Sequence, residues 1–143
     1  MDGTNESSNS VVTPAAFFGR IFDEALALTR EARDYLRDYG EVDSRDLAVE
    51  TAAHYSLETM RLTSRLTNMM TWLLVQRAVH RGDLTTEEMR EDPWRLGGRD
   101  VCLGQSEADP ELLPPYLCDL LRRSERLYRR IARLDHMVAS EPV

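Results

Sequence analysis

The chain has 143 residues, which is the usual size of one domain, and a hydrophobic content of 42%, enough for an ordinary core. All 18 basic residues are arginine, which excludes chemistry that needs a lysine, and the net charge of −7 opposes binding to nucleic acid or to an anionic membrane. Only 7 glycines and 6 prolines are present, and no apolar run is long enough to span a membrane, so a few long helices and an all-α fold are expected.

The N-terminal region predicts a leader followed by a helix. Residues 1–12 are rich in Ser, Asn and Thr without a hydrophobic period, which predicts a disordered leader. Thr13-Pro14 is typical of a helix start, with Thr as the cap and Pro at the first helical position. The helix should end at Gly40, and a short polar link should lead to an antiparallel second helix. Its apolar face repeats at steps of three and four: Phe18, Ile21, Ala25, Leu28, Ala32, Tyr35 and Tyr39.

A long second helix is predicted from near Ser44 to Arg81, with Gly82 as its stop. Its main apolar face consists of Ala48, Ala52, Tyr55, Thr59, Leu62, Leu66, Met69 and Leu73. A second apolar face carries Val49, Ala53, Met60, Met70 and Leu74. A helix with two apolar faces is central in a bundle or is shared between subunits, so we expect a symmetric homodimer.

The C-terminal half predicts a short helix, a long loop and a last helix. Thr85-Thr86-Glu87-Glu88 is a capping box, and its helix should stop before Asp92-Pro93. Residues 93–113 have no period, and a loop of this length is usually functional or disordered. The last helix should begin near Pro114-Pro115, with an apolar face at Leu117, Leu120, Ser124, Leu127, Ile131, Leu134 and Val138.

The predicted fold class is therefore all-α, with a single domain over residues 13–139 and a short tail at residues 140–143. The architecture is an antiparallel three-helix bundle with one short extra helix and a long loop, residues 93–113, before the last helix.

No constellation for catalysis, a metal or a cofactor is recognisable. His54 lies between Glu50 and Glu58 at helical spacing, but di-iron bundles need two Glu-x-x-His pairs, so we interpret these three as a solvated polar face. Cys102 and Cys118 lack the spacing of a zinc site. We expect no enzymatic activity and no cofactor. Because the first residues also lack the features of a signal peptide, we expect free thiols in a reducing cytoplasm.

The second helix carries a polar flank whose residue types are common in binding hot spots. Arg61, Arg65, Trp72 and Gln76 share this flank, and Arg and Trp are enriched in hot spots. One interpretation is a protein-binding surface that also includes Arg77 and, in the loop, Trp94. The alternative is that Trp72 packs under a neighbouring helix with Arg65 stacked over it.

Four arginines repeat along the last helix, opposite its apolar face: Arg122, Arg126, Arg129 and Arg133. Residues 118–138 hold six arginines against three acids, a local charge of +3. Three interpretations remain open, which are a solvated face, a docking stripe for an acidic protein patch, and a nucleic-acid surface. No recognition-helix context supports the third.

Part of the sequence resembles a known family. The stretch Glu58 to Leu66, which reads ETMRLTSRL, and the stretch Trp72 to Val79, which reads WLLVQRAV, resemble the regulator of CtrA degradation family, bacterial cell-cycle proteins of the RcdA type. The last helix also fits, through Leu113-Pro114, Leu117, Leu120-Leu121, Ser124, Arg126-Leu127, Arg130-Ile131 and Leu134-Asp135. The likeness covers about residues 48–138 and is strongest over 58–82.

The resemblance implies a small homodimeric helical bundle without enzymatic activity. Proteins of this family act as adaptors that help to bring substrates to the ClpXP protease, together with a response-regulator-type adaptor. For this chain it implies a cytoplasmic, cofactor-free scaffold for regulated proteolysis in the cell cycle, with protein partners. The alternative function is that of a transcription or nucleic-acid accessory protein that uses the arginine stripe of the last helix.

Overall fold

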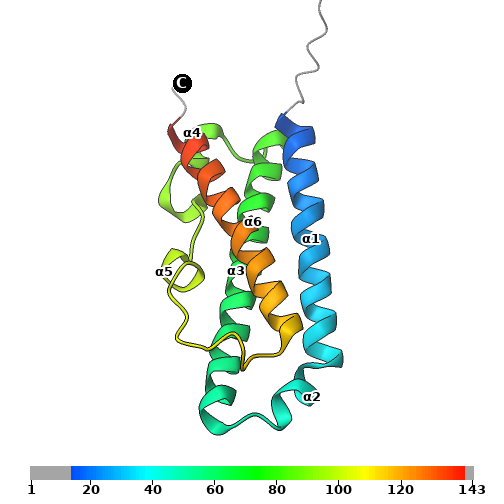
Figure 1. Ribbon diagram of the computed structural model, residues 1–143. Helices are drawn as coiled ribbons and strands as arrows, with labels where there is room; N and C mark the ends of the chain where they lie inside the picture. Colours follow the sequence, from blue (N-terminus) through cyan, green and yellow to red (C-terminus); the bar gives the residue numbers. More distant parts are fainter. Residues whose placement is uncertain (1–13, 141–143) are drawn as a thin grey trace, which may run out of the picture.

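The computed structural model describes residues 14–140, and over that range it is helical, without strands, as the sequence predicts. The predicted leader over residues 1–12, the Thr13 cap and the tail beyond residue 140 lie outside the described residues. The elements in chain order, shown in Figure 1, are α1 (Pro14–Asp38), α2 (Gly40–Arg45), α3 (Val49–Arg81), α4 (Thr86–Met89), the 3-10 helix η1 (Asp92–Trp94), α5 (Arg99–Cys102) and α6 (Pro115–Ser140).

Three long helices, α1, α3 and α6, form a bundle around one core (Figure 1). The apolar faces predicted from the helical period supply this core, because residues three and four apart lie on the same side of a helix. The fully buried aliphatic and sulfur side chains include Ile21 of α1, Leu62, Met69 and Leu73 of α3, and Leu117, Leu120 and Ile131 of α6. Tyr39, which the pattern placed on the core face, is exposed instead.

The directions of the helices differ from the prediction of an antiparallel bundle. α1 runs opposite to both other long helices, but α3 and α6 run in the same direction (Figure 1). Side-chain contacts confirm this, since Arg65 of α3 bonds to the first half of α6 at Ser124, and Trp72 bonds to the second half at Asp135. The cause is the connection over residues 82–114, here called the crossover segment, which returns along the bundle before α6 begins.

The crossover segment is more structured than the predicted loop. The capping box is confirmed, because Thr85 Oγ1 accepts a hydrogen bond from the backbone N–H of Glu88 at 3.1 Å. The range predicted as a loop over 93–113 contains the end of η1 and all of α5, and it buries Leu96, Cys102 and Leu113 against the bundle. These buried side chains attach the segment to the core along its length.

The link between α1 and α3 is also helical. Gly40 is the first residue of α2 rather than a stop signal, and α3 begins at Val49 rather than near Ser44. Gly40 is buried, and the hydroxyl of Tyr55 donates to its carbonyl at 3.3 Å. At the other end of α3 the predicted stop is confirmed, since Gly82 has a φ of 81°, which favours glycine.

Candidate functional site

Among residues 14–140, no group of three or more His, Cys, Asp or Glu side chains is placed to hold a metal ion. Both cysteines are free thiols, with Cys102 buried and Cys118 partly buried. In the same range, no helix combines the length and the apolar character that crossing a membrane requires. The features that stand out are a buried polar layer, an arginine-rich groove and an uncharged helix face.

The polar flank of α3, predicted as a surface, lies in the interior. Arg65, Trp72 and Gln76 are all buried, and Arg65 is only 4% exposed. The indole Nε1 of Trp72 donates to Asp135 at 2.9 Å, and its ring packs on Phe18 of α1. The surface location predicted for these three residues is therefore wrong, and the alternative, in which Trp72 packs under its neighbours, is confirmed. The crossover segment and α6 cover this flank.

Arg65 joins three parts of the fold rather than stacking on Trp72. Its Nε donates to the carbonyl of Cys102 in α5 at 2.8 Å. Its Nη1 donates to two acceptors on α6, the carbonyl of Leu121 at 2.9 Å and the hydroxyl of Ser124 at 3.2 Å. Burial lowers the pKa of the guanidinium, which nevertheless stays protonated as arginine does in proteins.

Arg61 also attaches the crossover segment to α3. Its Nη1 donates to the carbonyls of Val101 and Gly104, and its Nε lies 3.3 Å from a carboxylate oxygen of Glu58. Glu58 in turn accepts a hydrogen bond from the hydroxyl of Ser106 at 2.8 Å. Arg61 and Arg65, adjacent on one helix face, therefore fasten the same segment.

Asp135 of α6 is a candidate functional residue that the sequence indicated only as part of the family resemblance. Its buried carboxylate accepts hydrogen bonds from Trp72, from Arg95 at 3.0 and 3.1 Å, and from the backbone N–H of Leu96 at 3.3 Å. Arg99 lies 4.0 Å from it. Asp135 thus connects α3, α6 and the crossover segment. An acid beside the apolar face of the last helix was the one signal of it.

Arg77 and Trp94 do not belong to one surface with the buried flank. The guanidinium of Arg77 lies over the ring of Phe22, 4.0 Å from its centroid, where a cation–π contact forms. Trp94 is exposed in η1. The structure therefore separates the residues that the sequence grouped around the flank.

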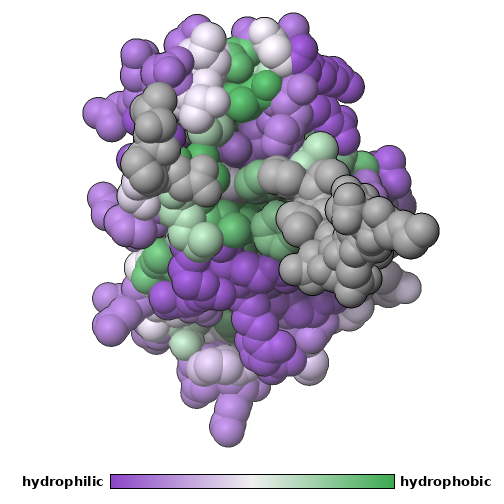
Figure 2. All heavy atoms as spheres, turned by 90° about the horizontal axis from the view of Figure 1, so that it is seen from above, coloured by the Kyte–Doolittle hydropathy of each residue, from purple (hydrophilic) through white to green (hydrophobic). Residues whose placement is uncertain are grey.

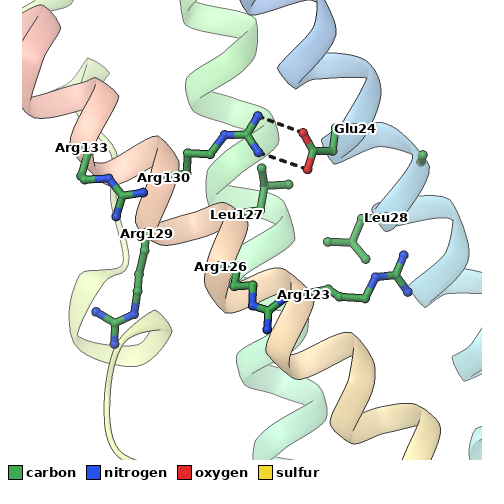
Figure 3. Close-up of a pocket in the computed structure, with 9 residues that line it drawn as sticks. Glu24, Leu28, Arg123, Arg126, Leu127, Arg129, Arg130 and Arg133 are labelled. Carbon is green, nitrogen blue, oxygen red and sulfur yellow. Dashed lines mark hydrogen bonds and ion pairs between the residues drawn. The ribbon is translucent and has the colours of Figure 1, made fainter.

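The arginines of α6 do form one surface feature. A groove of about 600 Å³ runs between α1 and α6, and Figure 3 shows the side chains that line it. Five of its lining residues are arginines, and one, Glu24, is acidic. We call this feature the Arg groove, which is lined by Glu24, Ala27, Leu28, Arg123, Arg126, Leu127, Arg129, Arg130 and Arg133.

Acids neutralise some of these arginines and leave two without an acid. Arg130 reaches Glu24 across the groove at 3.0 Å, as Figure 3 shows. Arg129 pairs with Glu125 at 2.9 Å. Arg126 and Arg133 have no ion pair or hydrogen bond with any of the described residues and are exposed. Arg122, predicted with this set, lies outside the groove and pairs with Asp119.

One end of the Arg groove is organised by Glu31. Its carboxylate accepts bonds from Arg123 at 2.6 and 2.8 Å and from the hydroxyl of Tyr116 at 2.6 Å. Hydrogen bonding to Arg123, and then to Tyr116, lowers the pKa of Glu31 to about 2. The same contact raises the pKa of Tyr116. This cluster ties α1 to the start of α6.

The outer face of α3 is uncharged over about six turns. Between Ala53 and Leu74, the exposed residues of α3 are Ala53, Ser56, Leu57, Met60, Thr63, Thr67, Thr71 and Leu74. Two of the threonine hydroxyls, on Thr63 and Thr71, donate to backbone carbonyls of their own helix, so they need no water when buried. By contrast, the end of the bundle seen in Figure 2 shows hydrophobic patches interrupted by hydrophilic side chains.

Comparisons with known proteins found a matching family model and a similar crystal structure. The family model described as "Protein of unknown function (DUF1465)" matches residues 10–143. The crystal structure of RcdA from Caulobacter crescentus CB15 is similar, with 37% sequence identity and a TM-score of 0.71, over 87% of this chain and 92% of that chain. No curated protein sequence matches this chain.

Proposed function

The chain belongs to this RcdA-type family, and from that premise we propose that it is a cytoplasmic, non-enzymatic adaptor that helps to deliver substrates, such as cell-cycle regulators, to the ClpXP protease. An adaptor needs a rigid body and separate weak contact surfaces, because it acts by raising the effective concentration of one partner near another. The bundle provides the rigid body, and the Arg groove and the outer face of α3 provide two separate surfaces.

The observation that carries the proposal is the pair of exposed arginines in the Arg groove that have no acid partner within residues 14–140. Arg126 and Arg133 lie two turns apart on α6, on a protein whose net charge is −7. Arginine is enriched in hot spots and pairs with carboxylates in a bidentate way. We propose that this groove docks an acidic patch of a protein partner, such as the ClpX unfoldase or a response-regulator-type adaptor.

Affinity capture from a native bacterial lysate, read by mass spectrometry, tests this proposal. We expect ClpX or a receiver-domain protein to be enriched with the unmodified chain and lost with the double variant Arg126→Glu, Arg133→Glu. The matched control is Arg45→Glu, Arg81→Glu, two exposed arginines outside the groove with the same change of net charge. Equal capture by both variants would contradict the assignment of the groove. Capture of neither partner by the unmodified chain would contradict the adaptor function.

The outer face of α3 supports a homodimer as part of the same proposal. Its uncharged exposed residues span roughly 30 Å of helix, at 1.5 Å per residue. A two-fold axis across this face would pair α3 with α3 of a second copy and duplicate the Arg groove. We expect light scattering to give twice the 16.4 kDa mass of the chain.

A charge on this face tests the dimer. Met60→Glu buries a carboxylate at the proposed interface, so we expect a monomer mass at tens of micromolar protein. Met137→Glu is the matched control, because Met137 of α6 is also exposed, at 58% against 66% for Met60. A monomer mass for the unmodified chain, or dimers of both variants, would contradict this interface.

The nucleic-acid alternative is not favoured. It predicts binding whose affinity falls steeply with salt, since phosphate contacts release counterions. We expect no binding of duplex DNA at 50 mM salt, and measurable binding that is lost in the Arg126→Glu, Arg133→Glu variant would revive the alternative.

A further inference from the structure

A second cavity, which shares Arg129 with the Arg groove, lies between α3, α6 and the crossover segment. Its volume is about 770 Å³, within the range that small ligands occupy. The apolar part of its wall includes Leu103 and Leu113 of the crossover segment and Leu121 of α6. The polar part of its wall includes Arg61, Arg65, Arg122, Arg129, Glu58 and Glu125.

Arg65 is the wall arginine that lacks an acid. Arg61 pairs with Glu58 at 3.3 Å and Arg129 pairs with Glu125 at 2.9 Å, so both wall carboxylates are already paired. The remaining wall arginine, Arg122, pairs with Asp119 at 3.3 Å. No acid among the described residues forms an ion pair with Arg65, although that side chain is 4% exposed. Burial lowers the pKa of Arg65, and the charges of Glu125 and Glu58, which act at a distance, offset this only in part, so a carboxylate in direct contact would stabilise the buried cation.

The hydrogen bonds of Arg65 leave only the Nη2 nitrogen of its guanidinium without an acceptor among the described residues. Nε and Nη1 donate to neutral acceptors, two carbonyls and a hydroxyl, whereas Nη2 donates to none of the described residues. A carboxylate is the acceptor that would bind Nη2 most strongly, because a hydrogen bond between two charged groups is about twice as strong as one between neutral groups. An apolar body attached to that carboxylate would find the leucine side chains of the same cavity.

We propose that this cavity binds a small ligand in which a carboxylate is attached to an apolar body, with the carboxylate on Arg65 and the body against Leu103, Leu113 and Leu121. This chemistry is shared by a free aliphatic acid and by the C-terminal residue of a peptide. Because Arg65 bonds to both α5 and α6, the bound ligand would strengthen the attachment of the crossover segment to the bundle.

Cys118 supplies a reporter inside the cavity. Its thiol lines the wall and is partly buried, whereas the other cysteine, Cys102, is buried and inaccessible to reagents in the folded protein. The experiment follows alkylation of Cys118 by iodoacetamide with mass spectrometry, in the presence of octanoate, 1-octanol or acetate at equal concentration. Octanol lacks the carboxylate and acetate lacks the long apolar body, so each control removes one half of the proposed chemistry.

We expect octanoate to slow the alkylation about tenfold at ten times its dissociation constant, by simple occupancy, and the two controls to have no effect. A second pair of probes distinguishes the sources, acetyl-alanyl-leucine with a free C-terminal carboxylate and the same dipeptide as an amide. Protection by the dipeptide acid at lower concentration than octanoate assigns a chain terminus, and the reverse order assigns a free acid. Equal protection by octanoate and either control, or protection by neither acid, overturns the proposal.

A variant tests, without the use of Cys118, whether the ligand binds in this cavity. Ala108 lines the cavity from the crossover segment, so Ala108→Phe fills part of the space without touching the hydrogen bonds of Arg65. We expect calorimetry to show at least a tenfold weaker affinity for octanoate in this variant. Ala48→Phe, at an exposed residue just before α3 that lines neither this cavity nor the Arg groove, is the control that keeps the affinity. Unchanged affinity of a folded Ala108→Phe protein would remove the ligand from this cavity.

Discussion

Two helices of this bundle carry arginines at helical spacing, four residues apart on α3 and seven apart on α6, and the two sets have opposite surroundings. Arg61 and Arg65 of α3 lie under the crossover segment and bond to its backbone. Arg126 and Arg133 of α6 extend into an open groove without an acid partner among the described residues. The difference teaches that a polar stripe indicates a surface only where no later segment of the chain covers it.

Among the groups that hold the covering segment, the buried carboxylate of Asp135 accepts hydrogen bonds from the most partners, and removing it should have the largest effect. Asp135→Ala leaves Arg95, the indole of Trp72 and the N–H of Leu96 without their acceptor, which we expect to lower the free energy of unfolding by about 3–5 kcal/mol. Urea denaturation measures this. A loss below 1 kcal/mol would show that the crossover segment is held without Asp135.

Comparing one arginine from each set is the direct test of their difference. Arg65→Ala removes three hydrogen bonds and opens a buried space, so we expect a loss of about 2–4 kcal/mol in the free energy of unfolding. Arg126→Ala, on the exposed set, should change it by no more than about 0.5 kcal/mol. Thermal unfolding of the two variants side by side provides the measurement, and equal losses would erase the distinction.

The fit of the crossover segment against α3 can be tested at a glycine. Gly98 has a φ of 77°, and a Cβ there would lie 2.6 Å from Nδ2 of Asn68. We expect Gly98→Ala to lower the free energy of unfolding by about 1–2 kcal/mol. Gly19→Ala in α1 is the matched control, since a Cβ there meets no atom within 4 Å and alanine favours the helix by about 0.5–1 kcal/mol. Denaturation curves that move in opposite directions would confirm the close fit.

The smallest effect concerns the ion pair that ties α1 to the Arg groove. The pKa of Glu31 is lowered to about 2 from the ordinary 4.5, so its stabilisation is complete above pH 4.5 and is lost as the pH falls towards 2. Glu31→Gln should therefore cost about 1 kcal/mol at pH 7, after allowance for solvent screening, and progressively less as the pH falls to 2 and below. Unfolding measured across this range checks the sign, and a difference that grows at low pH would contradict it.

The sequence predicted the structural features that depend on local sequence patterns. The apolar faces of α1, α3 and α6, the capping box at Thr85 and the stop at Gly82 are all local patterns, and they are confirmed except at Tyr39 and Ala48, which are exposed. The direction of α6 was predicted wrongly, because a connection of irregular sequence does not specify where along the bundle it runs. The helix α2 was missed for a related reason, since Gly40 is a common stop signal and its contact with Tyr55 is not visible locally.

The candidate site was predicted only in its exposed half. The arginine stripe of α6 lies where the spacing placed it, because Arg122, Arg126, Arg129 and Arg133 are all exposed among the described residues. The flank of α3 was mistaken for a surface because the groups that bury Arg65 include the backbone carbonyls of Cys102 and Leu121, and a carbonyl has no signature in a sequence. Asp135 was overlooked because its partners, Trp72 and Arg95, are 63 and 40 residues away in the chain.

The parallel course of α3 and α6 also has a consequence for the order of folding. α1 and α3 are joined by a short connection and can pair early, whereas α6 reaches α3 only after the crossover segment has closed a long loop. We expect the α1–α3 hairpin to form the folding nucleus, with α6 docking after the transition state. Substitutions at Asp135 should then accelerate unfolding and leave the folding rate nearly unchanged, so the lifetime of the native protein depends on its last helix.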